Sequence, residues 1–259
     1  MNEKCRHEVL DGVLTIWNCN ASQRNALTPE YYEGVNAGLK RAAEERDIHA
    51  VILVGEGGFF CSGGNLNALK ERRELSVAER RAKVDELHAI IRAIRTCPKP
   101  VIAAVEGGAA GAGLSLAMAC DLIVAGESAQ FTLAYVKAGL TPDGGASHAL
   151  MQAMPRATAA RMALLGAPLD APRMFALGVV SDVVPDADVL QRARSLALQL
   201  GRGPEQAIAQ IKKLLNDAET AEFETHLIAE RDAVCDALGG DEAAEGIRAF
   251  LEKRKPVFR

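Results

Sequence analysis

Two glycine-rich segments contain the residue types in this sequence that best suit chemistry. Residues 55–66 read GEGGFFCSGGNL and residues 106–113 read EGGAAGAG, and each follows a run of apolar residues. Glycine lets a ligand approach the backbone, and the first N–H groups of a helix have no partner inside that helix. Because such N–H groups favour negative charge, these segments predict a site for an anion or a developing oxyanion.

Two other interpretations of these glycines stay open. The first is close packing of one backbone on another, which also requires residues without bulky side chains. The second is a dinucleotide site, which needs the spacing G-x-G-x-x-G. Counted from Gly55 the last position is Phe60, and counted from Gly111 it is Leu116, so the spacing disfavours a dinucleotide.

A serine hydrolase is a further alternative, because residues 113–117 read GLSLA and resemble a nucleophile elbow. Asp143 and His148 follow Ser115 in the chain order that such hydrolases use. The elbow places its serine in the turn directly after a strand, whereas Ser115 lies ten positions beyond Val105 in an expected helix. This position disfavours the hydrolase.

Alternating strand and helix signals place both glycine-rich segments directly after strands. Val9 to Trp17, interrupted by Asp11-Gly12, predicts a β-hairpin. A helix is expected from Thr28, an N-cap followed by proline, to about Arg46. Further strands are expected at 50–54, 101–105 and 122–125, and further helices at 77–95, 111–119 and after Pro142-Asp143. This order indicates an α/β core of stacked β-β-α turns.

The chain beyond about residue 186 carries helix signals alone. Apolar residues at helical spacing mark one helix face: Ala207, Ile208, Ile211, Leu214 and Leu215. Two more helices are expected at 219–237 and 241–253, so we divide the chain into a core at 1–190 and a helical region at 191–259. The apolar stripes need a partner surface, and the sequence leaves open whether this chain or another subunit provides it.

Composition narrows the class of partner. The chain has 30 Lys+Arg against 34 Asp+Glu, so it has no basic surplus for nucleic acid or an anionic membrane, and phosphates must be held locally. The apolar stretch 109–120 is too short to span a bilayer. The polar first residues show no secretory signal, and we expect a cytoplasmic protein with isolated thiols.

Four motifs in order along the chain resemble those of the crotonase (enoyl-CoA hydratase/isomerase) superfamily. Residues 60–66, FCSGGNL, are similar to its signature F-C-[AS]-G-x-D-L, with Asn65 in place of the usual aspartate. Residues 99–113 are similar to its K-P-V-I-A-A-V-x-G segment with the following glycines. Residues 24–27, RNAL, resemble its early CoA-contacting motif, and residues 249–256, AFLEKRKP, its terminal motif.

The resemblance implies an α/β spiral of β-β-α turns with a C-terminal helical trimerisation region. It also implies a homotrimer or dimer of trimers that binds an acyl-CoA thioester. Coenzyme A then enters as part of the substrate, and no cofactor or metal is expected. The N–H groups of Gly64 and Ala112 would hold the thioester oxygen, although Ala112 replaces the usual glycine.

The family motifs also assign substrate-binding positions. Matched position by position, these are Arg24, Ala26, Leu27, Ser62, Gly63, Asn65, Leu66, Gly111, Ser115, Tyr135, Phe250 and Lys253. We expect the CoA phosphates to be met by Arg24 and by Lys253 or Lys99, because the chain must place its cations locally. Phe250 and Lys253 belong to the segment that resembles one bordering a neighbour's CoA site.

The type of reaction depends on whether carboxylic acids occupy three positions of the family's motifs. Family members that hydrate enoyl-CoA use two glutamates, and this chain has Ser115 and Tyr135 there. Residues 139–143, GLTPD, resemble the G-x-x-P-[DE] segment of enoyl-CoA isomerases and of ring-opening epoxide isomerases, whose acid shuttles a proton. Asp143 as proton carrier predicts an isomerase. The alternatives are Asp143 as a helix N-cap, His148 as the acid/base, a hydratase-type lyase and a catalytically silent acyl-CoA binder.

Overall fold

The computed structural model describes residues 4–258, in which nine short strands form two sheets. The larger sheet has the order β1-β2-β3-β4-β6-β9. Its strands are β1 (Cys5–Leu10), β2 (Val13–Asn18), β3 (Ala50–Gly55), β4 (Val101–Val105), β6 (Leu122–Gly126) and β9 (Asp182–Val184). β1 and β2 form the predicted hairpin through Asp11 and Gly12, both at positive φ, and all other neighbours pair in parallel.

The smaller sheet joins β5 (Gly108–Ala110), β7 (Gln130–Thr132) and β8 (Leu169–Asp170). An isolated β-bridge pairs Ala109 of β5 with Cys61 and so extends the small sheet. A second isolated bridge pairs Gly64 with Leu27. Each turn of the chain therefore contributes a strand to the large sheet, a segment to the small one, and then a helix. This arrangement confirms the predicted spiral of β-β-α turns.

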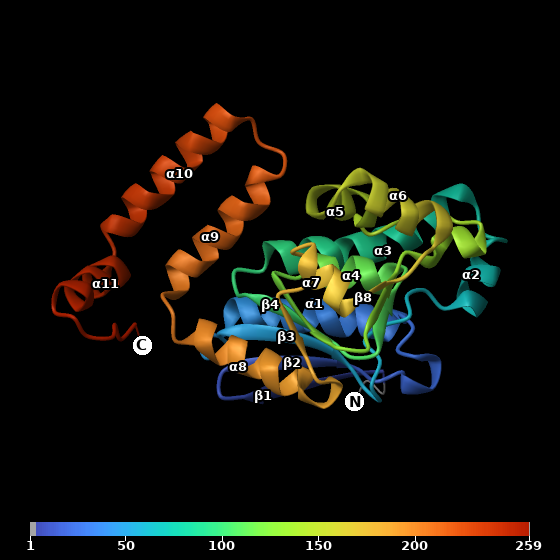
Figure 1. Cartoon of the computed structure of the whole chain (residues 1–259), viewed down its shortest axis with the longest axis horizontal. Helices are drawn as coiled ribbons and strands as arrows, with labels where there is room; N and C mark the ends of the chain where they lie inside the picture. Colours follow the sequence, from blue (N-terminus) through green and yellow to red (C-terminus); the bar gives the residue numbers. More distant parts are fainter. Residues whose placement is uncertain (1–3, 259) are drawn as a thin grey trace.

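Helices cover the sheets on both sides (Figure 1). The helices of the core are α1 (Pro29–Glu44), α2 (Leu66–Arg72), α3 (Val77–Thr96), α4 (Ala112–Ala119), α5 (Ala146–Ala153), α6 (Arg156–Leu165), α7 (Ala171–Ala176) and α8 (Val189–Gly201), with 3-10 turns η1 (Ala21–Gln23), η2 (Ala134–Ala138) and η3 (Asp186–Asp188). Thr28 caps α1 by accepting from the Tyr31 N–H, as the sequence predicted. A capping box of Ser76 and Glu79 begins α3.

The apolar core lies in two layers. The larger cluster fills the space between the two sheets and helices α1, α3 and α4. The smaller cluster lies between the other face of the large sheet and α8, where Ile52 and Ile102 meet Ala193 and Ala197. Because α8 covers the sheet, the first part of the predicted helical region packs on its own chain.

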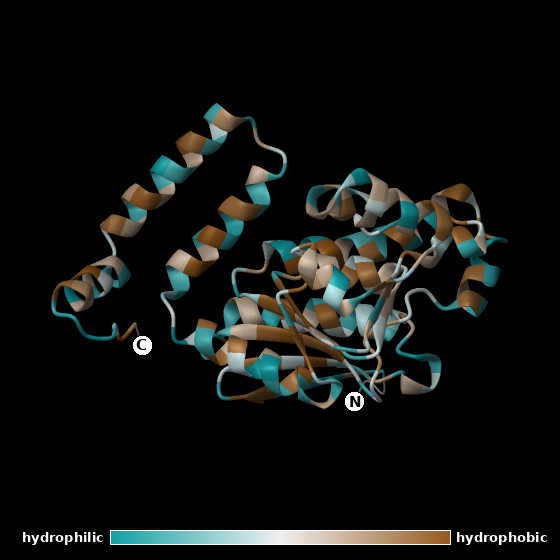
Figure 2. Cartoon of the chain, viewed as in Figure 1, coloured by the Kyte–Doolittle hydropathy of each residue, from teal (hydrophilic) through white to brown (hydrophobic). Residues whose placement is uncertain are grey.

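The C-terminal arm, as we name α9 (Glu205–Ala218), α10 (Phe223–Leu238) and α11 (Asp241–Leu251), projects from the body of the molecule (Figure 1). It is attached to the core by Lys212, whose ammonium donates to the Asp121 carboxylate at 2.7 Å and to the carbonyls of Ile94 and Lys99. Apolar residues recur along α9 and α10 even where these helices stand away from the core (Figure 2).

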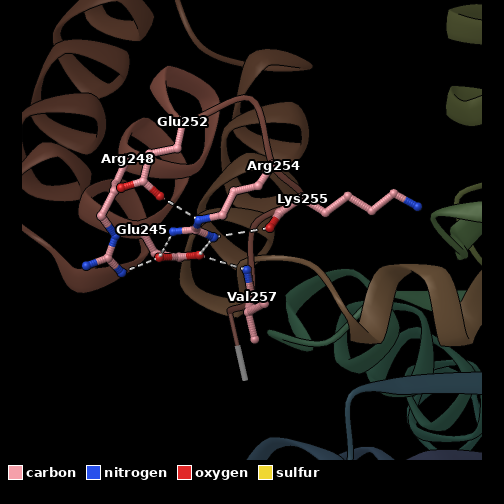
Figure 3. A network of polar contacts seen from close by, with 6 residues as sticks. All are labelled: Glu245, Arg248, Glu252, Arg254, Lys255 and Val257. Atoms are coloured by element: carbon pink, nitrogen blue, oxygen red, sulfur yellow. Dashed lines mark hydrogen bonds and ion pairs between the residues drawn. The ribbon is translucent and has the colours of Figure 1, made fainter.

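The turn after α11 is ordered by a network of charged groups around Glu245 (Figure 3). The Glu245 carboxylate accepts from the Arg254 guanidinium at 2.6 and 3.0 Å, from Arg248, and from the Val257 N–H at 2.9 Å. Hydrogen bonds from Arg254 and Arg248 hold the pKa of Glu245 far below its ordinary value. None of the helices within residues 4–258 is long and apolar enough to cross a membrane.

Candidate active site

The two glycine-rich segments meet at the carboxyl ends of β3 and β4. The Ala110 N–H donates to the Cys61 carbonyl at 2.9 Å, and the Leu27 N–H donates to the Gly63 carbonyl at 2.8 Å. A Cβ on Gly63, which has φ 90°, would lie 2.6 Å from the Ala110 oxygen and 3.1 Å from the Ala112 nitrogen. Only glycine lets the two loops approach this closely.

Gly64 and Ala112 present backbone N–H groups where these loops meet. Gly111 has φ 52° and precedes α4, so Ala112 is the first residue of that helix. Within residues 4–258 neither the Gly64 nor the Ala112 N–H donates to another backbone group. Both N–H groups are therefore available to an oxyanion, which the start of α4 also favours electrostatically.

Asn65 begins α2 as its N-cap. Its Oδ1 accepts from the N–H groups of Asn67 at 2.9 Å and Ala68 at 3.3 Å, and so caps α2. Its Nδ2 donates to Gln23 Oε1 at 2.6 Å, a bond that an aspartate would not make. The sequence did not predict α2, because residues 66–72 follow a glycine-rich loop and have weak periodicity.

Ser115, Tyr135 and Asp143, which we call the acid/base cluster, lie together although they come from three separate segments. The Tyr135 hydroxyl donates to Asp143 Oδ1 at 2.5 Å. The Ser115 hydroxyl donates to the Asp143 carbonyl at 2.9 Å and lies 3.4 Å from the Tyr135 oxygen. The Tyr135 ring also lies beside Gly111, because a Cβ there would be 3.9 Å from Tyr135 Cζ. The cluster therefore borders the first turn of α4.

The hydroxyls of the cluster act as donors. Burial, and then the nearby Asp143 carboxylate, raise the pKa of Tyr135 well above its ordinary value, so the phenol keeps its proton. Ser115 is buried within α4. Gly144, at φ 61°, passes so close to Ser115 that a Cβ there would lie 2.8 Å from the serine Cβ. The loop that carries Asp143 is thus packed directly on α4.

The structure disagrees with three alternatives for the residues of this region. Asp143 is not the N-cap of α5, because that helix begins at Ala146 with Gly145 at its cap, and the Asp143 side chain turns to Tyr135. Ser115 is not on a nucleophile elbow, because it lies inside α4. His148 is exposed and faces Glu219 at 3.4 Å, so it takes no part in the cluster.

A cavity of about 450 Å³ opens beside Gly64. It is lined by Gln23, Ala26, Ser62, Gly64, Asn65, Leu66, Asn67, Ala134, Lys137 and Ala138. Half of these residues were predicted as site residues from the family motifs. Ala134, Lys137 and Ala138 of η2 were missed, because their place on the cavity wall depends on how the chain folds back after β7.

The predicted cations lie in different surroundings. Arg24, at φ 49°, is exposed and follows the cavity residue Gln23, with its guanidinium 5.7 Å from the Phe59 ring centroid. Lys99 is buried, pairs with Glu205 and precedes β4, at the opposite end of the sheet from the glycine-rich loops. The expected phosphate contact of Lys99 is therefore wrong.

Phe250 belongs to α11, and Lys253 follows that helix. Figure 1 shows α11 on the opposite side of the molecule from α2, whose first residues Leu66 and Asn67 line the cavity. Phe250 is 84% exposed, and Lys253 follows α11 with φ 54°. Within one chain neither residue reaches the cavity. Their predicted contact with CoA thus requires a neighbouring copy. Among the described residues no group of three His, Cys, Asp or Glu side chains is placed to hold a metal ion.

Comparisons with known proteins agree with this geometry. The model of the family "Enoyl-CoA hydratase/isomerase" matches residues 8–259. The chain is 35% identical over 254 residues to a "Probable enoyl-CoA hydratase" of Rhodobacter capsulatus, covering 98% of this chain and 96% of that one. It is 34% identical over 259 residues to the "1,2-epoxyphenylacetyl-CoA isomerase" of Escherichia coli, covering 100% and 99%.

The fold has a close structural match. A crystal structure of an enoyl-CoA hydratase from Polaromonas sp. JS666 superposes with a TM-score of 0.96 at 40% identity. That match covers 98% of this chain and 99% of the other.

Proposed function

The chain belongs to the enoyl-CoA hydratase/isomerase family, and from this premise we propose that it is an isomerase that shifts a carbon–carbon double bond of an acyl-CoA thioester. The observation that carries this proposal is the acid/base cluster. Its one carboxylate, Asp143, accepts from Tyr135 and is packed beside Ser115. A single acid/base that can take and return a proton is what a double-bond shift requires.

Hydration makes a different demand. It needs a water that is both positioned and deprotonated, and the family's hydratases use two glutamates for this. Ser115 and Tyr135 occupy those positions, and both donate hydrogen bonds to Asp143. A serine and a phenol with a raised pKa cannot act as carboxylate bases at neutral pH. These replacements favour isomerisation over hydration.

The proposed reaction begins with the thioester oxygen held by the N–H groups of Gly64 and Ala112. This contact stabilises the enolate, and one such donor typically contributes about 3 to 4 kcal/mol in the transition state. The Asp143 carboxylate removes a proton from C2 of a 3-enoyl thioester, and the electron pair of the C–H bond enters the dienolate. Asp143 then returns the proton to C4, which leaves the double bond between C2 and C3.

The names of the relatives support an enzyme that acts on an acyl-CoA thioester, but they do not agree on the reaction. The Escherichia coli relative is named an isomerase, whereas those of Rhodobacter capsulatus and Bacillus subtilis are named probable hydratases. Hydratase-type activity is therefore the second candidate, and a silent acyl-CoA binder is the third. The presence of Asp143 in the cluster argues against the silent binder.

We also propose that the protein assembles as a trimer or a dimer of trimers, with CoA phosphates met by Arg24 of one copy and Lys253 of another. Large apolar side chains on the arm are exposed in the single chain: Ile211, Leu215, Phe223, Ile228, Val234, Leu238, Phe250 and Leu251. Contiguous exposed apolar surface marks an interaction site. Sedimentation at micromolar concentration should give a multiple of 27.5 kDa, and a single-chain mass alone would contradict the assembly.

Turnover of a matched panel of thioesters tests the reaction. The panel contains 3-enoyl-CoA, 2-enoyl-CoA and ring-epoxide CoA thioesters of similar size. We expect conversion of 3-enoyl to 2-enoyl thioester to exceed the hydration of 2-enoyl thioester. Brisk hydration with no isomerisation would overturn the isomerase in favour of the hydratase, and binding without any turnover would favour the silent binder.

A further inference from the structure

Lys137 has no role in the reaction derived above, yet it lines the cavity beside Gly64. It belongs to η2, which follows directly from the small sheet. Among the described residues that line this cavity, Lys137 is the one with a charged side chain. The other walls are formed by amides, a hydroxyl, backbone and small or aliphatic side chains. A lone cation on such a wall is suited to a single anionic group.

The Lys137 side chain is held in place by a neighbouring helix. Gly166, at φ 57°, ends α6, and a Cβ at this position would lie 2.8 Å from Lys137 Cε and 3.2 Å from its Cγ. The lysine stem therefore lies along the Gly166 backbone. The negative end of the α6 dipole favours a cation nearby. Within residues 4–258 no ion pair joins Lys137 to a carboxylate.

The rest of the cavity wall suits the neutral part of a pantetheine arm. Gln23, Asn65 and Asn67 offer side-chain amides, and Ser62 offers a hydroxyl, beside the small Ala26. A pantetheine arm carries two amides and a hydroxyl and has no charge until its terminal phosphate. An arm that leaves a thioester at Gly64 and runs through this cavity reaches solvent with that phosphate, where an exposed lysine can meet it.

We propose that Lys137 binds the phosphate that ends the pantetheine arm of the acyl thioester. The inference rests on the proposed function in one respect, that the thioester oxygen lies at Gly64 and Ala112. The same phosphate occurs in coenzyme A and in the phosphopantetheine of an acyl carrier protein, so the chemistry recognised is a phosphopantetheine thioester. Arg24 does not line the cavity; it follows Gln23 in the chain, and its carbonyl accepts from the Ser62 N–H at 3.0 Å.

Three saturated ligands isolate the phosphate: hexanoyl-CoA, hexanoyl-phosphopantetheine and hexanoyl-pantetheine. The dissociation constant of each is measured by calorimetry for the wild type, Lys137→Met and Lys137→Arg. We expect Lys137→Met to weaken the two phosphate-bearing ligands by about tenfold, the scale of one charge-assisted contact. Binding of hexanoyl-pantetheine should change less than twofold, and Lys137→Arg should restore most of the loss.

Lys40→Met is the matched control. Lys40 is an exposed cation on α1 that does not line the cavity, so this substitution removes the same charge at a distant place. It should leave all three dissociation constants unchanged. Equal weakening of all three ligands by Lys137→Met would mean that the lysine only shapes the wall, and would overturn the proposal. Weaker binding of hexanoyl-CoA alone would mean that Lys137 contacts the nucleotide of CoA. Unchanged binding of all three ligands would mean that Lys137 contacts none of them. Either result would overturn the proposal.

The wild-type titration separates this inference from the proposed function. If the wild type binds none of the three thioesters, the proposed function fails, and the Lys137 contact fails with it. If the wild type binds hexanoyl-CoA and Lys137→Met binds it equally well, only the Lys137 contact is wrong.

Discussion

The acid/base cluster and the C-terminal arm differ in what they expose. The cluster holds polar side chains inside the core, whereas the arm holds apolar side chains at the surface. Ser115 is 2% exposed and hydrogen-bonded among apolar neighbours, whereas Phe250 is 84% exposed at the end of a helix surrounded by charged residues. The cluster has its hydrogen-bond partners within one chain. The arm leaves its apolar face open, and no residue of α10 is buried.

This contrast separates two requirements of the site. The core positions Asp143 and the Gly64 and Ala112 N–H groups, which we propose as oxyanion donors, by packing loops on α4, and it does so without a second chain. The Glu245 network holds the end of the arm in place. The apolar side chains of the arm, however, need another surface to cover them. Chemistry should therefore be sensitive to substitutions in the cluster, and assembly to substitutions in the arm.

The largest effect is expected from Asp143→Asn. An amide cannot take and return the proton, so the isomerase rate should fall by roughly 10²-fold or more, the usual contribution of a general acid/base. Binding of a saturated acyl-CoA should stay nearly intact, because the oxyanion donors that we propose are backbone N–H groups, which the substitution does not remove. A steady-state rate assay with a binding titration checks both. A variant that isomerises at the wild-type rate would refute the role of Asp143.

A smaller loss of rate is expected from Tyr135→Phe. The variant removes the hydrogen bond to Asp143 Oδ1 and keeps the aromatic ring. We expect kcat to fall by about tenfold with KM little changed, since a hydrogen bond to a charged group contributes about 1.5 to 3 kcal/mol. Steady-state kinetics of the variant and the wild type, measured side by side, check both parameters.

Ser115→Ala is the companion variant. Its hydroxyl donates to the Asp143 carbonyl and not to the carboxylate, so this variant should lower kcat less than Tyr135→Phe does. If Tyr135→Phe left kcat unchanged, Tyr135 would be a wall residue only.

Ile228→Glu tests the arm. Ile228 is half exposed on α10, so a charge there should leave the single chain folded but disrupt an interface on the apolar face. We expect a fall in sedimentation mass towards 27.5 kDa. Acyl-CoA binding should weaken by about fivefold, the scale of one exposed ionic contact with Lys253. Val77→Glu, which charges an exposed apolar residue outside the arm, should retain the wild-type mass.

The smallest effect is expected from Glu245→Gln. The pKa of Glu245 is lowered by Arg254 and Arg248, so its carboxylate contributes stability that is complete above about pH 4.3, the ordinary glutamate value, and is lost as pH falls towards the folded pKa. The variant should melt a few degrees below the wild type at pH 7. This difference should shrink below about pH 4 in calorimetric scans. A difference that stays constant from pH 7 to pH 3 would exclude the charge of Glu245 as its cause.

Much of the fold follows from local signals. The hairpin at Asp11-Gly12, the N-cap at Thr28 and the apolar runs of β3 and β4 each have a short-range cause, and the structure confirms them. The predicted phosphate contact of Lys99 was wrong because local sequence gave no sign of Glu205, which lies 106 positions away. The place of Lys137 on the cavity wall was also missed, because it too depends on segments that are far apart in the sequence.

By itself, the sequence determined the two glycine-rich loops, the strands before them and the identity of the three residues in the acid/base cluster, because motif spacing and periodicity act over short stretches of chain. Only the tertiary structure decided that Tyr135 donates to Asp143 and that Asp143 is not a helix cap. It also decided that α11, the helix of Phe250, stands on the opposite side of the molecule from α2. These outcomes depend on contacts between segments far apart in sequence, whose geometry is set by the packing of the whole core.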